Sequence, residues 1–208
     1  MLVPAYHTLF IPPVGDAPLV FAFHGTGGDE TQFTRLIGEI LPGAGIVAPR
    51  GDVSEQGASR FFRRTGEGVY DMEDLARRTE GMSAFVHATR SKFPGRAAFA
   101  MGYSNGANIL ASMSFAEAAL FDRLALLHPL IPWRPAENVG LARRSILITA
   151  GRRDPIVPVA LTEALAGYYR SQGAIVTLEM HDGGHEIQNR EVAALTRFFA
   201  AKPWNGDF

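Results

Sequence analysis

Short apolar runs alternate along this chain with longer amphipathic segments. The runs are rich in aliphatic and aromatic residues, as buried parallel strands are, whereas the segments between them place apolar residues near helical spacing. Such alternation is typical of βαβ units around a largely parallel sheet. The pattern predicts strands at residues 19–23, 46–48, 97–101, 124–127, 146–150 and 175–179, an added edge strand at 6–11, and helices at 31–40, 71–92, 105–113, 158–172 and 189–200.

The chain length bounds the domain organisation. With 208 residues the chain can bury one sizeable core but is short for two, so we expect a single domain over residues 1–208. Residues 49–69 form a predicted irregular loop rich in glycine and arginine. A loop of that length is usually functional, and this one is too short for a separate lid domain. We therefore predict an α/β fold with a mostly parallel sheet, helices on both faces and no lid domain.

The composition excludes several classes of function. A net charge of −1 gives no basic surface for nucleic acid, and the absence of cysteine excludes disulfides, thiolate metal sites and a cysteine nucleophile. No apolar stretch reaches the roughly 18 residues that a membrane span requires, and the first residues lack a basic leader. We expect a cytoplasmic protein that binds no nucleic acid, inserts in no membrane and needs no metal or other cofactor. Whether it forms a homodimer stays open.

The candidate chemistry centres on Gly102-Tyr103-Ser104-Asn105-Gly106, which lies between a predicted strand and a predicted helix. A serine on such a sharp turn has a strained backbone, and only very small residues fit two positions before and after it. The glycines at 102 and 106 meet that need. This context predicts Ser104 as a nucleophile.

A serine hydroxyl is a weak nucleophile that needs an adjacent base, itself held in one tautomer by a carboxylate. After a serine on this kind of turn, the acid and then the histidine follow in chain order, each beyond a later strand. Asp154 follows the predicted strand 146–150 and His185 follows 175–179, so we predict them as acid and base. The alternatives are His181 and His128 for the base, with His7, His24 and His87 lying upstream of the serine, and Asp182 and Asp122 for the acid.

Acyl transfer also requires backbone N–H groups that stabilise the developing oxyanion. The predicted strand 19–23 runs into His24-Gly25-Thr26-Gly27-Gly28, a loop whose backbone can approach a substrate closely. We predict the N–H groups of Thr26 and Asn105 as the two donors. The alternatives are a simple strand-ending turn and a phosphate-binding loop, although neither glycine-rich phosphate motif is completed here.

Together these segments resemble the carboxylesterase/phospholipase family of α/β hydrolases, which includes acyl-protein thioesterases and small bacterial esterases. The resemblance implies an α/β-hydrolase fold with the same triad and oxyanion donors, and the family often has a bulky apolar residue where this chain has Thr26. The resemblance spans nearly the whole chain. The segments that carry it are His24-Gly25-Thr26-Gly27-Gly28, Pro49-Arg50-Gly51, Gly102-Tyr103-Ser104-Asn105-Gly106, Gly151-Arg152-Arg153-Asp154-Pro155-Ile156-Val157-Pro158 and Gly184-His185.

A second group of residues provides candidate substrate contacts. Arg60-Phe61-Phe62-Arg63-Arg64, followed by Gly68-Val69-Tyr70-Asp71, resembles a bacterial subgroup associated with quinone or copper stress. Arginines beside phenylalanines can bind an aromatic or carboxylate-bearing ester, or can instead pair with nearby carboxylates and pin the loop. The candidates are Arg60, Arg63 and Arg64, together with Trp133 and His128, which follow a predicted strand at the sheet edge where ligands collect.

The sequence thus predicts a serine carboxylesterase that acts through an acyl-enzyme on small to medium soluble esters, with thioesters as further substrates. The same triad could instead serve perhydrolysis, amide cleavage or acyl transfer to another acceptor, because fold and triad do not decide between acceptors. A non-catalytic ligand-binding protein is a third interpretation. An intact set of Ser, Asp, His and oxyanion donors argues against it.

Overall fold

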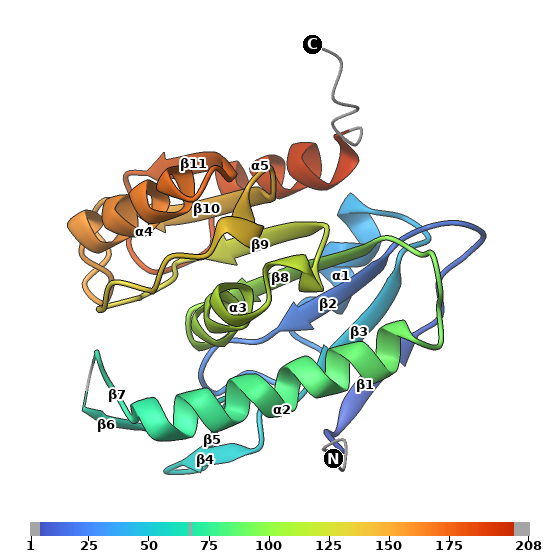
Figure 1. Cartoon of the computed structure of the whole chain (residues 1–208), viewed down its shortest axis with the longest axis horizontal. Helices are drawn as coiled ribbons and strands as arrows, with labels where there is room; N and C mark the ends of the chain where they lie inside the picture. The colour runs from blue at the N-terminus through green and yellow to red at the C-terminus, as the bar shows by residue number, and fades with distance from the viewer. Residues whose placement is uncertain (1–4, 67, 202–208) are drawn as a thin grey trace.

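The centre of the protein is a seven-stranded sheet, seen in a computed structural model that describes residues 5–66 and 68–201 (Figure 1). Its strands are β1 (Thr8–Ile11), β2 (Leu19–Phe23), β3 (Gly45–Pro49), β8 (Ala98–Tyr103), β9 (Arg123–Leu127), β10 (Ser145–Gly151) and β11 (Ile175–His181). They lie in the order β1-β3-β2-β8-β9-β10-β11, with β1 antiparallel to β3 and the other neighbours parallel. Each strand predicted from the apolar runs is present.

Helices cover both faces of the sheet. They are α1 (Thr34–Ile40), α2 (Met72–Arg90), α3 (Asn105–Ala116), α4 (Val159–Ser171) and α5 (Asn189–Ala200), with short 3₁₀ turns η1 (Ala118–Leu120) and η2 (Val139–Leu141). Side chains of α2, α3 and α4 share one core cluster, and those of α1 and α5 share the other (Figure 1). The predicted fold class is therefore confirmed. Over the described ranges, no helix combines the length and the apolar character needed to cross a membrane.

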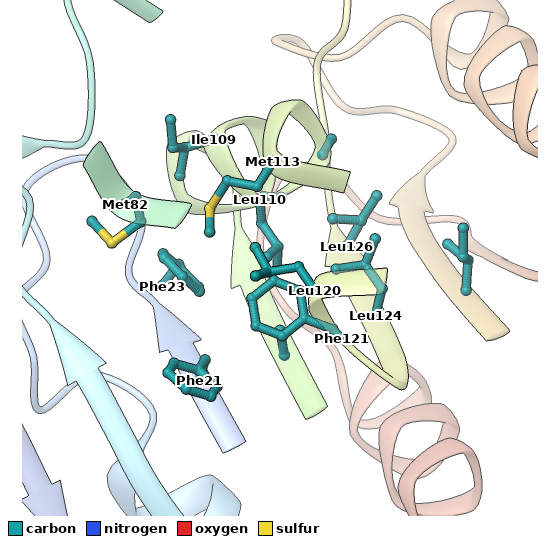
Figure 2. Close-up of a cluster of buried hydrophobic side chains, with 14 of the residues drawn as sticks. Phe21, Phe23, Met82, Ile109, Leu110, Met113, Leu120, Phe121, Leu124 and Leu126 are labelled. Carbon is teal, nitrogen blue, oxygen red and sulfur yellow. The ribbon is translucent and has the colours of Figure 1, made fainter. Parts of the chain in front are cut away.

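Strand β2 shows how the sheet divides the core. All of its residues are buried because helices lie on both sides. Successive side chains of a strand point to opposite faces, so Leu19, Phe21 and Phe23 enter the cluster with α2 and α3, whereas Val20 and Ala22 enter the cluster with α1 and α5. Figure 2 shows the first cluster, in which rings from the sheet meet side chains from the helices. Each large apolar side chain buried in this way stabilises the fold by about 1.5–3 kcal/mol.

The segment 49–69 differs from the prediction of an irregular loop. It holds one antiparallel hairpin of β4 (Val53–Glu55) with β5 (Ala58–Arg60), and it leads into a second of β6 (Arg64–Gly66) with β7 (Val69–Tyr70). Gln56 and Gly57 form the first turn with φ values of 50° and 88°. Positive φ at both central residues matches the twist of a tight hairpin. The segment is therefore a built element that can place side chains accurately.

Candidate active site

Ser104 lies on a sharp turn between β8 and α3, with its φ of 52° in the left-handed region. The turn is closely packed on both sides. A Cβ atom at Gly102 would lie 2.5 Å from the carbonyl oxygen of Gly106, and one at Gly106 would lie 2.3 Å from that of Phe23. Real Cβ atoms do not approach so closely, so only glycine fits either position. The steric reason behind the sequence motif is thus present in the structure.

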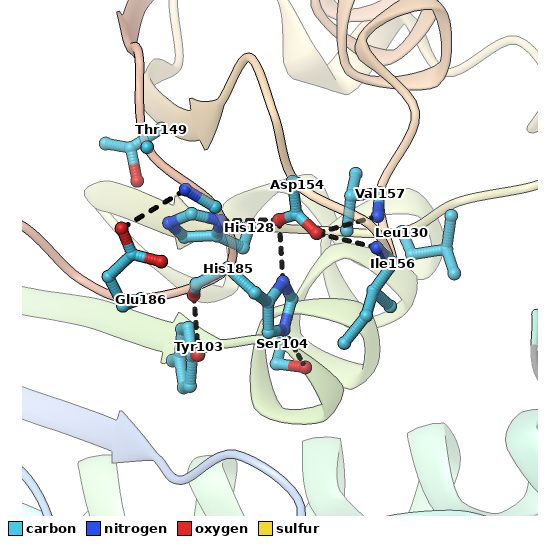
Figure 3. A network of polar contacts seen from close by, with 12 residues as sticks. Tyr103, Ser104, His128, Leu130, Thr149, Asp154, Ile156, Val157, His185 and Glu186 are labelled. Atoms are coloured by element: carbon cyan, nitrogen blue, oxygen red, sulfur yellow. Dashed lines mark hydrogen bonds and ion pairs between the residues drawn. The ribbon is translucent and has the colours of Figure 1, made fainter.

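A chain of hydrogen bonds runs from Ser104 through His185 to Asp154 (Figure 3). Oγ of Ser104 lies 2.9 Å from Nε2 of His185, and Nδ1 of His185 lies 2.6 Å from Oδ2 of Asp154. Because an ionised carboxylate only accepts, Nδ1 carries the proton and Nε2 accepts from the serine hydroxyl. In this tautomer a histidine can take a proton from serine.

The Asp154 carboxylate is held in its ionised form. Burial alone would raise its pKa, but hydrogen bonds from His128, His185 and two backbone N–H groups outweigh burial and hold the pKa below its ordinary value. Oδ2 accepts from both histidine rings, while Oδ1 accepts from the N–H of Ile156 at 2.8 Å and of Val157 at 3.0 Å. The carboxylate is therefore fixed in place and fully charged.

The loops that carry the acid and the base are packed directly on each other. A Cβ atom at Gly151 would lie 2.0 Å from the carbonyl oxygen of Gly184, so only glycine fits at position 151. The N–H of Arg153 donates to the carbonyl oxygen of Gly183 at 2.9 Å. This close approach explains Gly151 and sets the separation of Asp154 and His185.

Thr26 and Asn105, the predicted oxyanion donors, border the same cavity as Ser104. Across the described residues, neither backbone N–H donates to a protein acceptor. Their side chains, in contrast, are tied down: Oγ1 of Thr26 accepts from Arg60 at 2.8 Å, and Oδ1 of Asn105 accepts from the N–H of Phe61 at 2.8 Å. Two immobilised residues thus present free N–H groups beside the serine.

His24 was an alternative base, and the structure gives it another place. Its Nε2 accepts the N–H of Gly51 at 2.9 Å, and its Nδ1 lies 2.7 Å from the carbonyl oxygen of Gly25. Burial lowers the pKa of this ring, which is therefore a neutral link between the loop after β2 and the segment after β3. This link accounts for the Pro49-Arg50-Gly51 motif, whose contact the sequence did not reveal.

The cavity that contains Ser104 measures about 320 Å³ and is also bordered by Arg60 and Arg64. A larger and more open hollow of about 1140 Å³ lies at the opposite edge of the sheet, beside the first residues of β9 and β10. Ligands of open α/β sheets bind outside the carboxyl ends of the strands, where Ser104, His185 and Asp154 lie. The smaller cavity is therefore the candidate active site.

Two predicted substrate contacts lie outside this cavity. The Arg63 side chain is 57% exposed and pairs with Asp71 at 2.9 Å. This pairing matches the alternative interpretation, in which the arginines of this segment pair with nearby carboxylates. Trp133 packs edge-on against Tyr70 and Phe115 at ring-centroid distances of 5.8 and 6.5 Å. Neither residue is therefore placed beside Ser104, whereas the predicted contacts Arg60 and Arg64 border the cavity.

His128 borders the cavity, but its side chain is fully buried and directed at Asp154. Its Nδ1 lies 2.8 Å from Oδ2 of Asp154, and its Nε2 lies 3.1 Å from Oε1 of Glu191. The sequence analysis missed Glu191. Its only signal was the pattern Gln188-x-x-Glu191, which forms a capping box at the start of α5.

His128, His181 and Glu191 bring three potential metal ligands together. However, Nδ1 of His181 accepts the N–H of Gly183 at 3.0 Å, so the ring proton is on Nε2, which faces Glu191 at 3.0 Å. A metal ion on that Nε2 would require the proton on Nδ1, against the Gly183 N–H. The donor chemistry of this set therefore fits ion pairing and not metal binding.

Comparison with known proteins finds relatives over most of the chain. The "Putative hydrolase MhqD" of Bacillus subtilis (strain 168) is 37% identical over 175 residues, which cover 83% of this chain and 88% of that protein. A solved carboxylesterase from Bacillus cereus is 34% identical with a TM-score of 0.88 and 93% coverage of both chains. The protein Atu2452 of unknown function from Agrobacterium tumefaciens str. C58 is 48% identical with a TM-score of 0.87, over 94% of this chain and 96% of that chain. No family model matches.

Proposed function

The chain belongs to the carboxylesterase/phospholipase family of α/β hydrolases, and we propose that it is a serine carboxylesterase that hydrolyses small to medium soluble esters and thioesters. The observation that carries this proposal is the continuous hydrogen-bond chain from the hydroxyl of Ser104 through His185 to Asp154. Free N–H groups of Thr26 and Asn105 beside the same cavity support it further.

In the first half of the reaction, Oγ of Ser104 attacks the ester carbonyl while Nε2 of His185 takes the hydroxyl proton. Asp154 stabilises the imidazolium that forms, and the N–H groups of Thr26 and Asn105 bind the oxyanion of the tetrahedral intermediate. When this intermediate collapses, the bond to the leaving oxygen breaks and His185 returns its proton to the departing alcohol. An acyl group then remains on Ser104.

In the second half, water replaces the serine as nucleophile. His185 removes a proton from the water as it attacks the acyl carbonyl, and the same N–H groups hold the second oxyanion. Collapse breaks the bond to Oγ of Ser104, which recovers its proton from His185. The acid product leaves and the resting hydrogen-bond chain reforms.

Covalent labelling with a fluorophosphonate tests this mechanism, because the reagent needs both an activated hydroxyl and an oxyanion hole. We expect one equivalent of label on Ser104 by peptide mass spectrometry. The Ser104→Ala variant, matched in fold by its thermal melt, should take up none. Labelling at another residue, or no labelling of folded protein, would contradict the mechanism.

Charge in the cavity favours esters that carry a carboxylate. Arg60 and Arg64 both border the cavity and share one carboxylate, that of Glu55, at 3.2 and 2.9 Å. No aspartate or glutamate is among the described residues that line the cavity. Burial, and secondarily the nearby Arg64, lower the pKa of Arg60, as expected for two cations with too little negative charge. A substrate carboxylate would supply the missing charge.

Arginine-to-methionine variants test this substrate class on matched neutral and anionic esters. Arg64→Met should lower kcat/KM for the anionic ester by an amount equivalent to about 1.5–3 kcal/mol of transition-state stabilisation, the range for a charge-assisted hydrogen bond. The kcat/KM for the neutral ester should change little. Arg63→Met is the control, since Arg63 lies outside the cavity. Equal losses on both esters in Arg64→Met would contradict carboxylate recognition and leave the triad untouched.

A further inference from the structure

Behind Asp154, away from Ser104, lies a buried cluster of ionisable side chains that the mechanism above does not use. Its members come from three elements: His128 follows β9, His181 ends β11, and Glu191 lies in the first turn of α5. Each is at most 3% exposed. Figure 3 shows His128 directed at Asp154 beside His185. The cluster therefore touches the triad through its acid.

Both ring nitrogens of His128 face carboxylates. Nδ1 lies 2.8 Å from Oδ2 of Asp154, the oxygen that also accepts from His185. Nε2 lies 3.1 Å from Oε1 of Glu191, an ion-pair contact rather than an aligned hydrogen bond. A neutral imidazole would turn a lone pair toward one of these anions, whereas an imidazolium has a proton on each nitrogen. The contacts of His128 therefore fit the charged ring.

The carboxylate of Glu191 is itself ionised. Its Oε1 accepts from the hydroxyl of Thr149 at 2.5 Å, and its Oε2 accepts from the N–H of Gln188 at 2.7 Å. Burial would raise the pKa of Glu191, but His128 and these two donors hold it below its ordinary value. Burial would likewise lower the pKa of His128, but Glu191 and Asp154 raise it. Both shifts agree with the contacts.

The backbone of His128 is strained. Its φ is 49°, in the left-handed region, and its side chain has no exposed surface. Strained residues persist where several contacts hold them, and such residues cluster at functional sites. Here the contacts are Asp154, Glu191 and a hydrogen bond from the His128 N–H to the carbonyl oxygen of Thr149 at 2.8 Å. An apolar side chain would fill the space without any of the side-chain contacts.

We propose that His128 is a permanently protonated positioning residue that, through Asp154, lowers the proton affinity of His185. The imidazolium satisfies the same Asp154 oxygen that holds His185, and it repels a second positive charge on that ring. His185 therefore remains unprotonated, and able to act as a base, at lower pH than in a triad without this cation. The effect on catalysis rests on the proposed function, whereas the charge of His128 does not.

Other groups around His128 leave this assignment intact. Nδ1 of His181 accepts the Gly183 N–H, so the ring proton lies on Nε2, which faces Glu191 at 3.0 Å without an aligned hydrogen bond. Tyr103 meets the His128 ring edge-on at 5.8 Å, and burial raises the pKa of its hydroxyl to about 12. The charged and titratable groups facing His128 are thus Asp154 and His185 from the loops after β10 and β11, Glu191 from α5, His181 from β11 and Tyr103 from β8.

The expected effect follows from the distance between the two rings, whose centroids lie 5.1 Å apart. Two unit charges at that distance repel each other, and with an effective dielectric constant between about 80 and about 20 the repulsion energy is equivalent to a titration shift of about 0.6–2.4 pH units. Removing the charge of His128 should therefore move the acid limb of kcat/KM upward by an amount in this range.

The test variant is His128→Asn. Asparagine tolerates positive φ and can place its amide N–H near the position of Nδ1, so the hydrogen bond to Asp154 can survive while the charge is lost. A second variant, Glu191→Gln, keeps the His128 ring and removes one of the two anions that keep it charged. The control is His181→Asn, which changes an equally buried but neutral ring of the same cluster. The acid limb should move upward in the first two variants and stay in place in the third.

Histidine-selective ¹⁵N NMR tests the charge without any enzyme assay. His128 should keep protons on both ring nitrogens at pH 8, and a single proton there would overturn the proposal. If His128 is doubly protonated but neither His128→Asn nor Glu191→Gln moves the acid limb, the coupling to His185 is refuted. If Ser104 takes no fluorophosphonate while the NMR result holds, the esterase mechanism fails and the charge assignment stands.

Discussion

Replacing Asp154 by Asn keeps the shape of the side chain but removes its charge and half of its acceptor capacity. Four N–H groups converge on this carboxylate: two from the rings of His128 and His185, and two from the backbone of Ile156 and Val157. An asparagine oxygen can serve one pair, and its NH₂ group then faces the other pair. Whichever way the amide turns, two N–H groups lose their acceptor.

The magnitude follows from this conflict. Two buried donors left without an acceptor cost about 1–3 kcal/mol each, so the free energy of unfolding should fall by about 2–6 kcal/mol. The effect on turnover should be larger, because His185 loses both its fixed tautomer and the partner of its cation. In the well-known serine protease triad the same exchange lowers kcat by about 10⁴, which sets the expected scale here.

The assay is the hydrolysis of a chromogenic acetate ester at saturating substrate, with urea unfolding of the same preparation to show that the variant is folded. Asp182→Asn is the matched control: its side chain is 89% exposed and lies 3.6 Å from Arg152. We expect that control to keep its turnover within about twofold, since surface substitutions have small effects. If Asp182→Asn abolishes turnover and Asp154→Asn spares it, the assignment of the acid is refuted.

Three further outcomes are expected. The single variants Ser104→Ala and His185→Ala should each lower kcat by several orders of magnitude, with little added loss in the double variant, because triad members act as a unit; additive losses would contradict a shared step. Gly106→Ala should fail to fold or should lose fluorophosphonate labelling of Ser104, because its Cβ would lie 2.3 Å from the carbonyl oxygen of Phe23. The control Gly167→Ala should fold and label normally, because no atom lies within 4 Å of the added Cβ. The folded-state pKa values of Asp154 and Glu191 lie below their ordinary values of 3.8 and 4.5. The two ionised carboxylates therefore stabilise the fold fully above these ordinary values, and this stabilisation is lost as the pH falls through the folded-state pKa values. Urea midpoints that do not fall on acidification below pH 4.5 would contradict this expectation.

The sheet could be predicted because its inner parallel strands, β2, β3, β8, β9 and β10, are buried on both faces and so appear as apolar runs. Strand β2 and helix α5 have the predicted bounds, 19–23 and 189–200. The triad positions followed from the same fact, since strand ends locate the loops that carry Ser104, Asp154 and His185. Chain order then selected among several histidines and aspartates.

The segment after β3 could not be predicted in this way. Its strands are two or three residues long, too short to show a period, and its first turn is Gln56-Gly57 rather than a residue pair that marks hairpins. What fixes it is tertiary: Arg60 reaches Thr26, and the N–H of Phe61 reaches Asn105. Such contacts with distant residues leave no local pattern.

The proposal of His185 as the base depends on proton positions, which no sequence pattern encodes. His181 accepts a backbone N–H on Nδ1, so its remaining nitrogen can only donate. His128 faces an anion on each side, so both of its nitrogens carry protons. Only His185 of these three has a nitrogen that is free to accept, and that nitrogen lies 2.9 Å from Oγ of Ser104. The ring nitrogens of His181 and His128 are thus occupied by their own partners. These partners also make the burial of the two rings possible, because a buried polar group is stable only when it has a hydrogen-bond or ion-pair partner.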